Sequence, residues 1–309
     1  MALVFAGCGH PPRQAAASTA RDHIRHVVII VQENRSFDNL FHGFPGADTA
    51  NFGLTHDHRQ VPLHSVSLKA PYDISNGVGD FVRSYDRGKM DGWDRRPTTL
   101  RLRHGRARFL YPQYGFVPYS EAEPYFELAR RYVLADRMFQ SNIDQSFVAH
   151  LYLIAGQAGR TADVPSGRPW GCDAAPGTLV RTLRDDRSMG RQVFPCFDFR
   201  TLGDELDAQE LTWRYYAPKI DSWQLWRRVA ELRRQRKPLS KKMHVPDFGQ
   251  LWTSYDAIAH DRYGPDWSTN IVSPERQVII DVKNGDLAAV TWVIPDWKNS
   301  DHSSAGSDT

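Results

Sequence analysis

The sequence predicts a fold of the α/β class, because apolar strand-like runs alternate along the chain with segments that have helical spacing. Residues 26–32 (HVVIIVQ) and residues 287–294 (LAAVTWVI) are continuous apolar runs that are too short for a typical helix. Such runs are typical of strands that are buried on both faces of a parallel or mixed sheet. We therefore expect both runs to be buried strands.

Three segments between these runs favour helices. One expected helix runs from Ser146 to about Ala155 with Gly156 as its stop, and another begins at residues 201–206. The remaining segment, residues 119–139, comes before these two in the chain and places apolar side chains at helical spacing. Its candidate core contacts are Phe126, Leu128, Ala129, Val133 and Leu134.

The other segments are interpreted as one more strand and two long loops. Residues 211–217 (LTWRYYA) favour a strand. Residues 43–79 and 160–200 are rich in residue types that form turns, and we expect loops there.

Length and charge limit the classes of function. The chain has 309 residues, which is enough for one large α/β domain or two ordinary ones. Its 39 basic and 36 acidic residues give a net charge of +3, so nothing indicates a nucleic-acid partner. The basic run at residues 227–242 favours a solvated helix followed by a loop. The alternative is a patch that attracts anionic substrate or lipid headgroups.

The N-terminal residues 1–22 are expected to form a signal or tether segment ahead of a domain over residues 23–309. A short apolar run ends at Cys8, which is close to the pattern of a bacterial lipoprotein signal but lacks its basic region. We expect an exported protein that is periplasmic, secreted or lipid-anchored at the cell envelope. The alternative is an accidental apolar start with a free thiol.

Two of the three cysteines, Cys172 and Cys196, lie apart from the N-terminus. No Cys-x-x-Cys spacing or nearby histidine pair makes them a zinc site. In an exported protein a bridge between them is the economical interpretation, and in a cytosolic protein both would be buried thiols. We favour the bridge.

Glu33 and Asn34 directly follow the first predicted strand. In open α/β sheets, sites form beyond the carboxyl ends of strands. A carboxylate beside an amide carbonyl offers two hard oxygen ligands to a divalent cation. An ordinary turn explains the same pair equally simply.

A second candidate segment is built around Ser146 and His150 at the start of a predicted helix. Unpaired N–H groups and the helix dipole at that end would stabilise a seryl alkoxide and hold a phosphate. His150, one turn on, would orient substrate or transfer a proton. The simpler alternatives are a helix cap and a packed histidine.

A third segment, residues 296–302 (DWKNSDH), follows the strand at residues 287–294 and repeats the arrangement of the first. It contains Asp301 and His302. Two such clusters at strand ends would face one site, which neither cluster predicts by itself.

These motifs, taken with their flanking residues, resemble the bacterial phosphoesterase family that includes phosphocholine-type phospholipases C and an acid phosphatase. The resemblance covers nearly everything from residue 23 onward, and its opening motif is long and ungapped. The matching segments are residues 26–48, 88–92, 114–116, 134–141, 146–157, 263–267 and 290–302.

The resemblance implies an alkaline-phosphatase-like α/β fold, with a central mixed, mostly parallel sheet and helices on both faces. It also implies hydrolysis of a phosphate ester with a divalent metal cation of open identity. The substrate would be a phospholipid, a phosphocholine ester or a simple phosphomonoester. In-line attack by the nucleophile would give a phosphoseryl intermediate that water then hydrolyses. By position, the metal ligands are Glu33 and Asn34, the nucleophile is Ser146, and the segment near the phosphate contains Asp301 and His302.

The chain departs from the family pattern at two points. A histidine that relatives often place before residues 88–92 corresponds to Asn76 here. Relatives also continue to an Asp-Asp pair that completes the metal site, and no matching pair occurs before Thr309. We therefore expect a domain that is incomplete at its C-terminus and binds metal weakly. The alternative function is a catalytically inactive truncated relative, which would be a non-enzymatic envelope protein.

Overall fold

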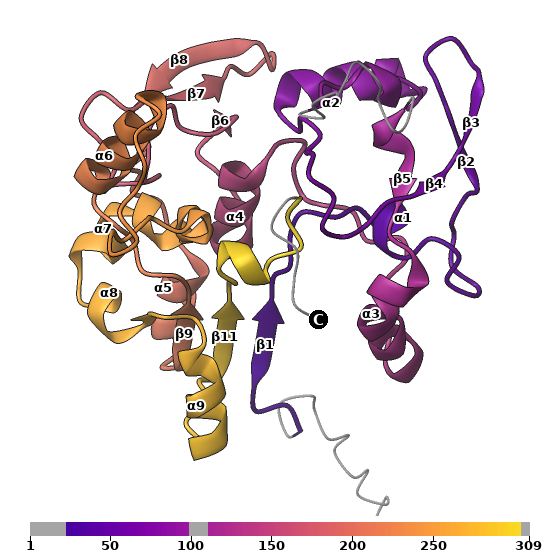
Figure 1. Ribbon diagram of the computed structural model, residues 1–309. Helices are drawn as coiled ribbons and strands as arrows, with labels where there is room; N and C mark the ends of the chain where they lie inside the picture. Colours follow the sequence, from indigo (N-terminus) through magenta and orange to yellow (C-terminus); the bar gives the residue numbers. More distant parts are fainter. Residues whose placement is uncertain (1–22, 99–110, 304–309) are drawn as a thin grey trace, which may run out of the picture.

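A four-stranded parallel sheet lies at the centre of the computed structural model, which describes residues 23–98 and 111–303 (Figure 1). All three neighbouring strand pairs in this sheet are parallel, and helices surround it, so the predicted α/β class is confirmed. The predicted signal or tether segment at residues 1–22 lies outside the described residues, as do residues 304–309 at the end of the predicted domain. In spatial order the strands are β1 (Val27–Ile30), β11 (Val290–Val293), β9 (Trp213–Tyr216) and β10 (Ile271–Val272).

The first and the last predicted strand of the chain, β1 and β11, differ in burial. β11 lies between β1 and β9, and its Thr291 and Trp292 are fully buried, as expected. β1 was expected to be buried on both faces, and this is wrong. Val28 and Ile30 are 43% and 69% exposed, because within the described residues β1 pairs only with β11 and its outer side is uncovered.

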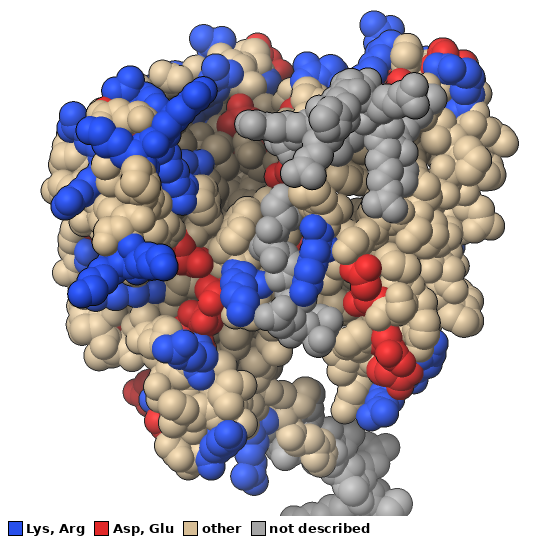
Figure 2. Space-filling model, viewed as in Figure 1, with Lys and Arg blue, Asp and Glu red and all other residues tan. Residues whose placement is uncertain are grey.

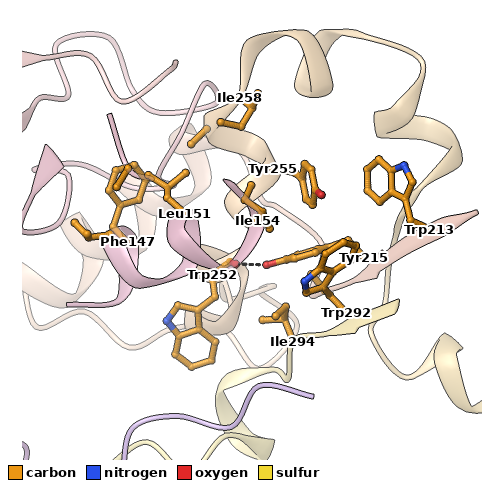
Figure 3. Close-up of a cluster of buried hydrophobic side chains, with 14 of the residues drawn as sticks. Phe147, Leu151, Ile154, Trp213, Tyr215, Trp252, Tyr255, Ile258, Trp292 and Ile294 are labelled. Atoms are coloured by element: carbon orange, nitrogen blue, oxygen red, sulfur yellow. Dashed lines mark hydrogen bonds between the residues drawn. The ribbon is translucent and has the colours of Figure 1, made fainter. Parts of the chain in front are cut away.

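The main hydrophobic core lies between the sheet and α4 (Ser146–Ala155). Figure 3 shows aromatic side chains of β9 and β11 facing the apolar side chains of α4. The Tyr215 hydroxyl donates a hydrogen bond of 2.7 Å to the Trp252 carbonyl, so the polar end of the ring is satisfied inside the core. The residues labelled in Figure 3 are Phe147, Leu151, Ile154, Trp213, Tyr215, Trp252, Tyr255, Ile258, Trp292 and Ile294.

Helix α4 has the predicted bounds and ends at Gly156, whose φ of 61° is the left-handed conformation that glycine adopts readily. The expected helix at residues 201–206 is α5 (Leu202–Asp207), capped by Thr201. The helix of the basic run is α6 (Trp223–Arg234), and a loop follows it, as predicted. The remaining helices on this side are α7 (Ala259–Tyr263), α8 (Asp266–Thr269) and α9 (Gln277–Asn284).

A second, smaller core joins α1 (Phe37–Leu40) to α3 (Tyr119–Arg131) on the right of Figure 1. The helix predicted to reach residue 139 ends at Arg131, and Leu128 and Val133 are exposed rather than core residues. The apolar residues after Arg131 are consecutive, so one helix face cannot bury them all. The buried members of this core are Leu40, Leu68, Val117, Ala122 and Phe126.

Both segments that were expected to be loops contain short strands. A hairpin and one strand of a parallel pair lie within residues 43–79, and an antiparallel three-stranded sheet lies within residues 160–200. These strands are two to five residues long, which is too short for a periodic pattern to show in the sequence. They are β2 (Phe52–Leu54), β3 (Gln60–Pro62), β4 (His64–Ser65), β5 (Gly115–Phe116), β6 (Thr161–Ala162), β7 (Val180–Leu183) and β8 (Met189–Val193).

The remaining helical segments connect these parts. None of the described helices is long and apolar enough to cross a membrane. They are α2 (Val78–Tyr85) and the short 3-10 helices η2 (Asp86–Gly88), η3 (Trp93–Arg95), η4 (Pro112–Tyr114), η5 (Phe248–Trp252), η6 (Ser254–Ala257) and η7 (Trp297–Asn299).

A disulfide joins Cys172 to Cys196, with 4.6 Å between their Cα atoms. This bond confirms the favoured interpretation of the two cysteines. It closes the ends of the segment that carries β7 and β8, and so fastens this small sheet to the core around α4.

Replacing Trp292 by alanine should lower the free energy of unfolding by about 3–5 kcal/mol, because the fully buried ring would leave a cavity. Urea denaturation followed by circular dichroism measures this change. The matched control is Ile30→Ala on the neighbouring strand, which should cost less than about 1 kcal/mol because the side chain is mostly exposed. Equal losses in the two variants would contradict this placement of the core.

Candidate active site

The segments that follow β1 and β11 leave the sheet at the same edge, because the two strands are parallel. The Arg35 side chain, which follows β1, holds the segment after β11 by a hydrogen bond. Its Nε donates a hydrogen bond of 2.8 Å to the Asp301 carbonyl, and its guanidinium also donates to the Leu68 carbonyl. Burial lowers the pKa of Arg35, against the opposing effect of the Asp301 charge. The two predicted polar clusters therefore lie in one region.

The Glu33 carboxylate is the centre of the candidate site. One of its oxygens, Oε1, accepts a hydrogen bond of 3.0 Å from the Ser146 hydroxyl. The other, Oε2, lies 2.8 Å from His150 Nε2. The structure thus brings together a predicted metal ligand and two predicted catalytic residues that lie more than a hundred positions away in the sequence.

Ser146 is the first residue of α4 rather than its cap. The capping position belongs to Gln145, whose side chain makes no capping hydrogen bond. The alternative interpretation of Ser146 as a helix cap is therefore wrong, since its hydroxyl points to Glu33 instead. The first N–H groups of a helix lack intrahelical partners, so this end of α4 can attract an anion next to the hydroxyl.

His150 lies one turn further along α4 and is only 4% exposed. Its ring stacks on Trp252, with 6.1 Å between centroids and 5° between planes. Because a carboxylate only accepts, Nε2 donates to Glu33, and the buried Nδ1 has no hydrogen-bond partner. His150 is therefore packed, as the simpler interpretation from the sequence had it, and it is also hydrogen-bonded to Glu33.

Asp301 is fully buried, and its Oδ2 accepts a hydrogen bond from the Tyr125 hydroxyl. This bond joins the segment after β11 to α3. The His302 ring lies tilted against Trp297 at 4.1 Å between centroids, and it stacks on Trp252 at 6.4 Å. Since His150 also stacks on Trp252, one indole contacts both predicted histidines.

Asn34, the second predicted metal ligand, follows Glu33 at a half-buried position. Its neighbour Ser36 has a structural role, because its hydroxyl caps α1 by accepting from the Asn39 N–H. Of the two predicted metal ligands, Glu33 is held beside the Ser146 hydroxyl, and Asn34 is its neighbour in the chain.

Two aspartates that the sequence did not single out hold the segment before α4. Asp144 accepts from the backbone N–H of Gln145 at 2.8 Å and from that of Asp163 at 2.9 Å. Burial raises the pKa of Asp144, although both hydrogen bonds act in the opposite direction. Asp163 in turn accepts from the Val78 N–H at the start of α2, at 3.2 Å. The only sequence signal was the turn-forming character of these residues.

Replacing Asp163 by alanine should lower the free energy of unfolding by about 1–3 kcal/mol, because the Val78 N–H loses its acceptor. Asp163 also has a φ of 63°, which asparagine tolerates better than alanine, so Asp163→Asn should recover most of the loss. Asp185→Ala, which removes an exposed ion pair with Arg160, is the neutral control. Urea denaturation measures all three, and equal losses for alanine and asparagine would count against this role.

One comparison bears on the chain as a whole. The family model described as the phosphoesterase family matches residues 24–308. This match includes both strands β1 and β11, the Glu33–Asn34 pair, Ser146 and the segment with Asp301 and His302.

Proposed function

The chain belongs to the phosphoesterase family, and we propose that it hydrolyses phosphate esters with Ser146 as the attacking nucleophile. The observation that supports this assignment is the hydrogen bond from the Ser146 hydroxyl to Glu33 at the uncapped start of α4. The proposed nucleophile therefore lies next to an acceptor for its proton and next to a helix end that attracts anions.

The proposed first step is attack of Ser146 Oγ on the phosphorus atom. The new O–P bond forms as the bond to the leaving alcohol breaks, and the hydroxyl proton passes to Glu33 Oε1. The N–H groups at the start of α4 would hold the non-bridging phosphoryl oxygens, whose charge the helix dipole favours. Water then cleaves the phosphoseryl bond in the reverse sense and frees the hydroxyl.

His150 is proposed to position Glu33 rather than to contact the substrate. Its Nε2 holds Oε2, which directs Oε1 towards Ser146, and stacking on Trp252 fixes the ring. His302 contacts the same indole and is only partly buried, so it is the candidate donor of a proton to the leaving alcohol. Asp301 holds its segment to α3 through Tyr125.

The donor set fits a hard divalent cation in ligand type. Glu33 and Asn34 would hold it, with the Ser146 oxygen beside them. Carboxylate oxygens that accept one hydrogen bond retain a lone pair for a metal. Such a cation would lower the pKa of the serine hydroxyl and neutralise phosphoryl charge. Hard cations take about six oxygen ligands, so water and substrate would supply the others.

The substrate class is proposed as that of the phospholipases C or acid phosphatases that the sequence resembles, with a phospholipid, phosphocholine ester or phosphomonoester as substrate. Lys and Arg side chains gather on the upper left of Figure 2, in the region of α6, and would favour an anionic surface. We also propose that the protein is exported, since disulfides such as Cys172–Cys196 persist mainly in oxidising compartments.

Replacing Ser146 by alanine should lower kcat for p-nitrophenyl phosphate or p-nitrophenyl phosphorylcholine by about 1,000-fold or more, since the nucleophile is lost. Release of p-nitrophenol in the presence of each common divalent cation measures the rate. Ser222→Ala, at the cap of α6, is the matched control and should be fully active. Normal turnover by Ser146→Ala would exclude this residue as the nucleophile. Inactivity of the unmodified protein with every cation would support the non-catalytic alternative.

Replacing Glu33 by glutamine should lower kcat by about 100- to 10,000-fold, because the amide cannot take the serine proton. The change is nearly isosteric, so the far-ultraviolet circular dichroism spectrum should stay the same. Glu231→Gln, on the surface of α6, controls for the loss of one negative charge. If the two variants had equal kcat values, Glu33 would have no part in the reaction.

A further inference from the structure

A second cluster of potential metal ligands lies away from Glu33. Asp204 belongs to α5, and His260 and Asp261 belong to α7, on the left of Figure 1. One ligand atom from each lies within 4.8 Å of the others. α5 packs near the C-terminal end of α4, about 15 Å of helix away from Ser146. The cluster is therefore separate from the candidate active site.

The hydrogen bonding of His260 leaves one of its nitrogens facing two carboxylates. Nδ1 lies 2.5 Å from Asp198 Oδ1, which only accepts and therefore fixes the proton on Nδ1. Nε2 then faces Asp204 Oδ2 at 3.2 Å and Asp261 Oδ2 at 3.6 Å. A nitrogen lone pair directed at two carboxylate oxygens is repulsive, so a positive charge must lie between them. That charge is a second proton on His260, a proton on one of the two carboxyl groups, or a metal cation.

Asp261 supplies a second and independent observation. Its side chain is 1% exposed, and neither carboxylate oxygen has a hydrogen-bond partner. A buried carboxylate without hydrogen bonds is costly unless a cation neutralises it. The side chain is therefore directed into the cluster with its ligand capacity unused.

We propose that Asp204, His260 and Asp261 bind a divalent transition-metal cation such as Zn²⁺. Bonds of about 2.0–2.2 Å in a tetrahedral site place neighbouring ligand atoms about 3.3–3.6 Å apart. The two distances from His260 Nε2, 3.2 and 3.6 Å, are close to this separation. A mixture of imidazole nitrogen and carboxylate oxygen suits zinc, manganese or iron better than it suits calcium.

The surroundings of the cluster are those of a supported metal site. Asp198 on Nδ1 forms the carboxylate–histidine–metal arrangement that orients a ligating ring. Asp204 is held by Thr201, whose backbone N–H and hydroxyl donate to Oδ2 at 2.6 and 2.9 Å. An open depression of about 430 Å³, lined by Asp198, Arg200, Asp204 and His260, gives the ion a path and room for a water ligand. The cation would tie α5 to α7.

The test titrates Zn²⁺ into the metal-free full-length Glu33→Gln protein by isothermal calorimetry, so that the candidate active site contributes least. We expect one Zn²⁺ per chain and a rise in Tm on binding. His260→Gln should weaken the affinity at least 100-fold, and Asp198→Asn about 10-fold or more. No binding, or an unchanged affinity in His260→Gln, would overturn the proposal and show that a proton rather than a metal balances the charges of this cluster.

His244→Gln is the matched control. His244 Nε2 lies 2.9 Å from Asp221 Oδ2, so it forms a similar histidine–aspartate pair, but it is 68% exposed and belongs to no group of three potential ligands among the described residues. This variant should bind Zn²⁺ like its parent. Should His260→Gln fail to fold, nitrogen NMR of the histidine rings decides the matter. A Zn²⁺-dependent shift at His260 Nε2 supports the proposal, and a shift confined to other rings overturns it.

Discussion

The parallel hydrogen bonds between β1 and β11 join two segments from opposite ends of the described chain. The candidate active site depends on this pairing, because it sends the residues after Ile30 and those after Val293 to one edge of the sheet. Arg35 then holds the second segment through the Asp301 carbonyl. Without the pairing, Glu33 would have no fixed position relative to α4, and the bonds to Ser146 and His150 would not form.

One carboxylate accepts both hydrogen bonds that define the site. Glu33 accepts from a hydroxyl and from an imidazole, and both donors come from the same face of α4, one turn apart. The aromatic layer around Trp252 keeps the imidazole in place. These contacts direct the serine oxygen, and the capping residue makes no side-chain hydrogen bond at the start of α4, where an anion would bind.

Much of this could be predicted from local sequence. The buried run of β11, the Gly156 stop of α4 and the polar segments that follow β1 and β11 are local signals, whereas only the family resemblance joined Ser146 to Glu33 in one site. The exposure of Ile30 could not be predicted, because burial on both faces depends on neighbours that a strand pattern does not reveal. The same holds for Leu128, whose helix lacks a partner on that face among the described residues.

The cluster of Asp204, His260 and Asp261 was also not predicted. Asp204 lies more than fifty residues before the adjacent pair His260 and Asp261, and no spacing rule links the first turn of α5 to a short helix such as α7. Only the packing of these helices brings them together. In contrast, Cys172 and Cys196 were paired by elimination, because few cysteines leave few combinations.

The pairing of β1 with β11 also determines when the central sheet can form during synthesis of the chain. β11 is synthesised about 260 residues after β1, which at about 5–20 residues per second means tens of seconds on the ribosome. During that interval the apolar side chains of β1 have no neighbouring strand. The central sheet is thus completed only when nearly the whole described chain has been synthesised. A nascent chain halted before residue 290 would therefore expose the unpaired apolar strand β1 to chaperones.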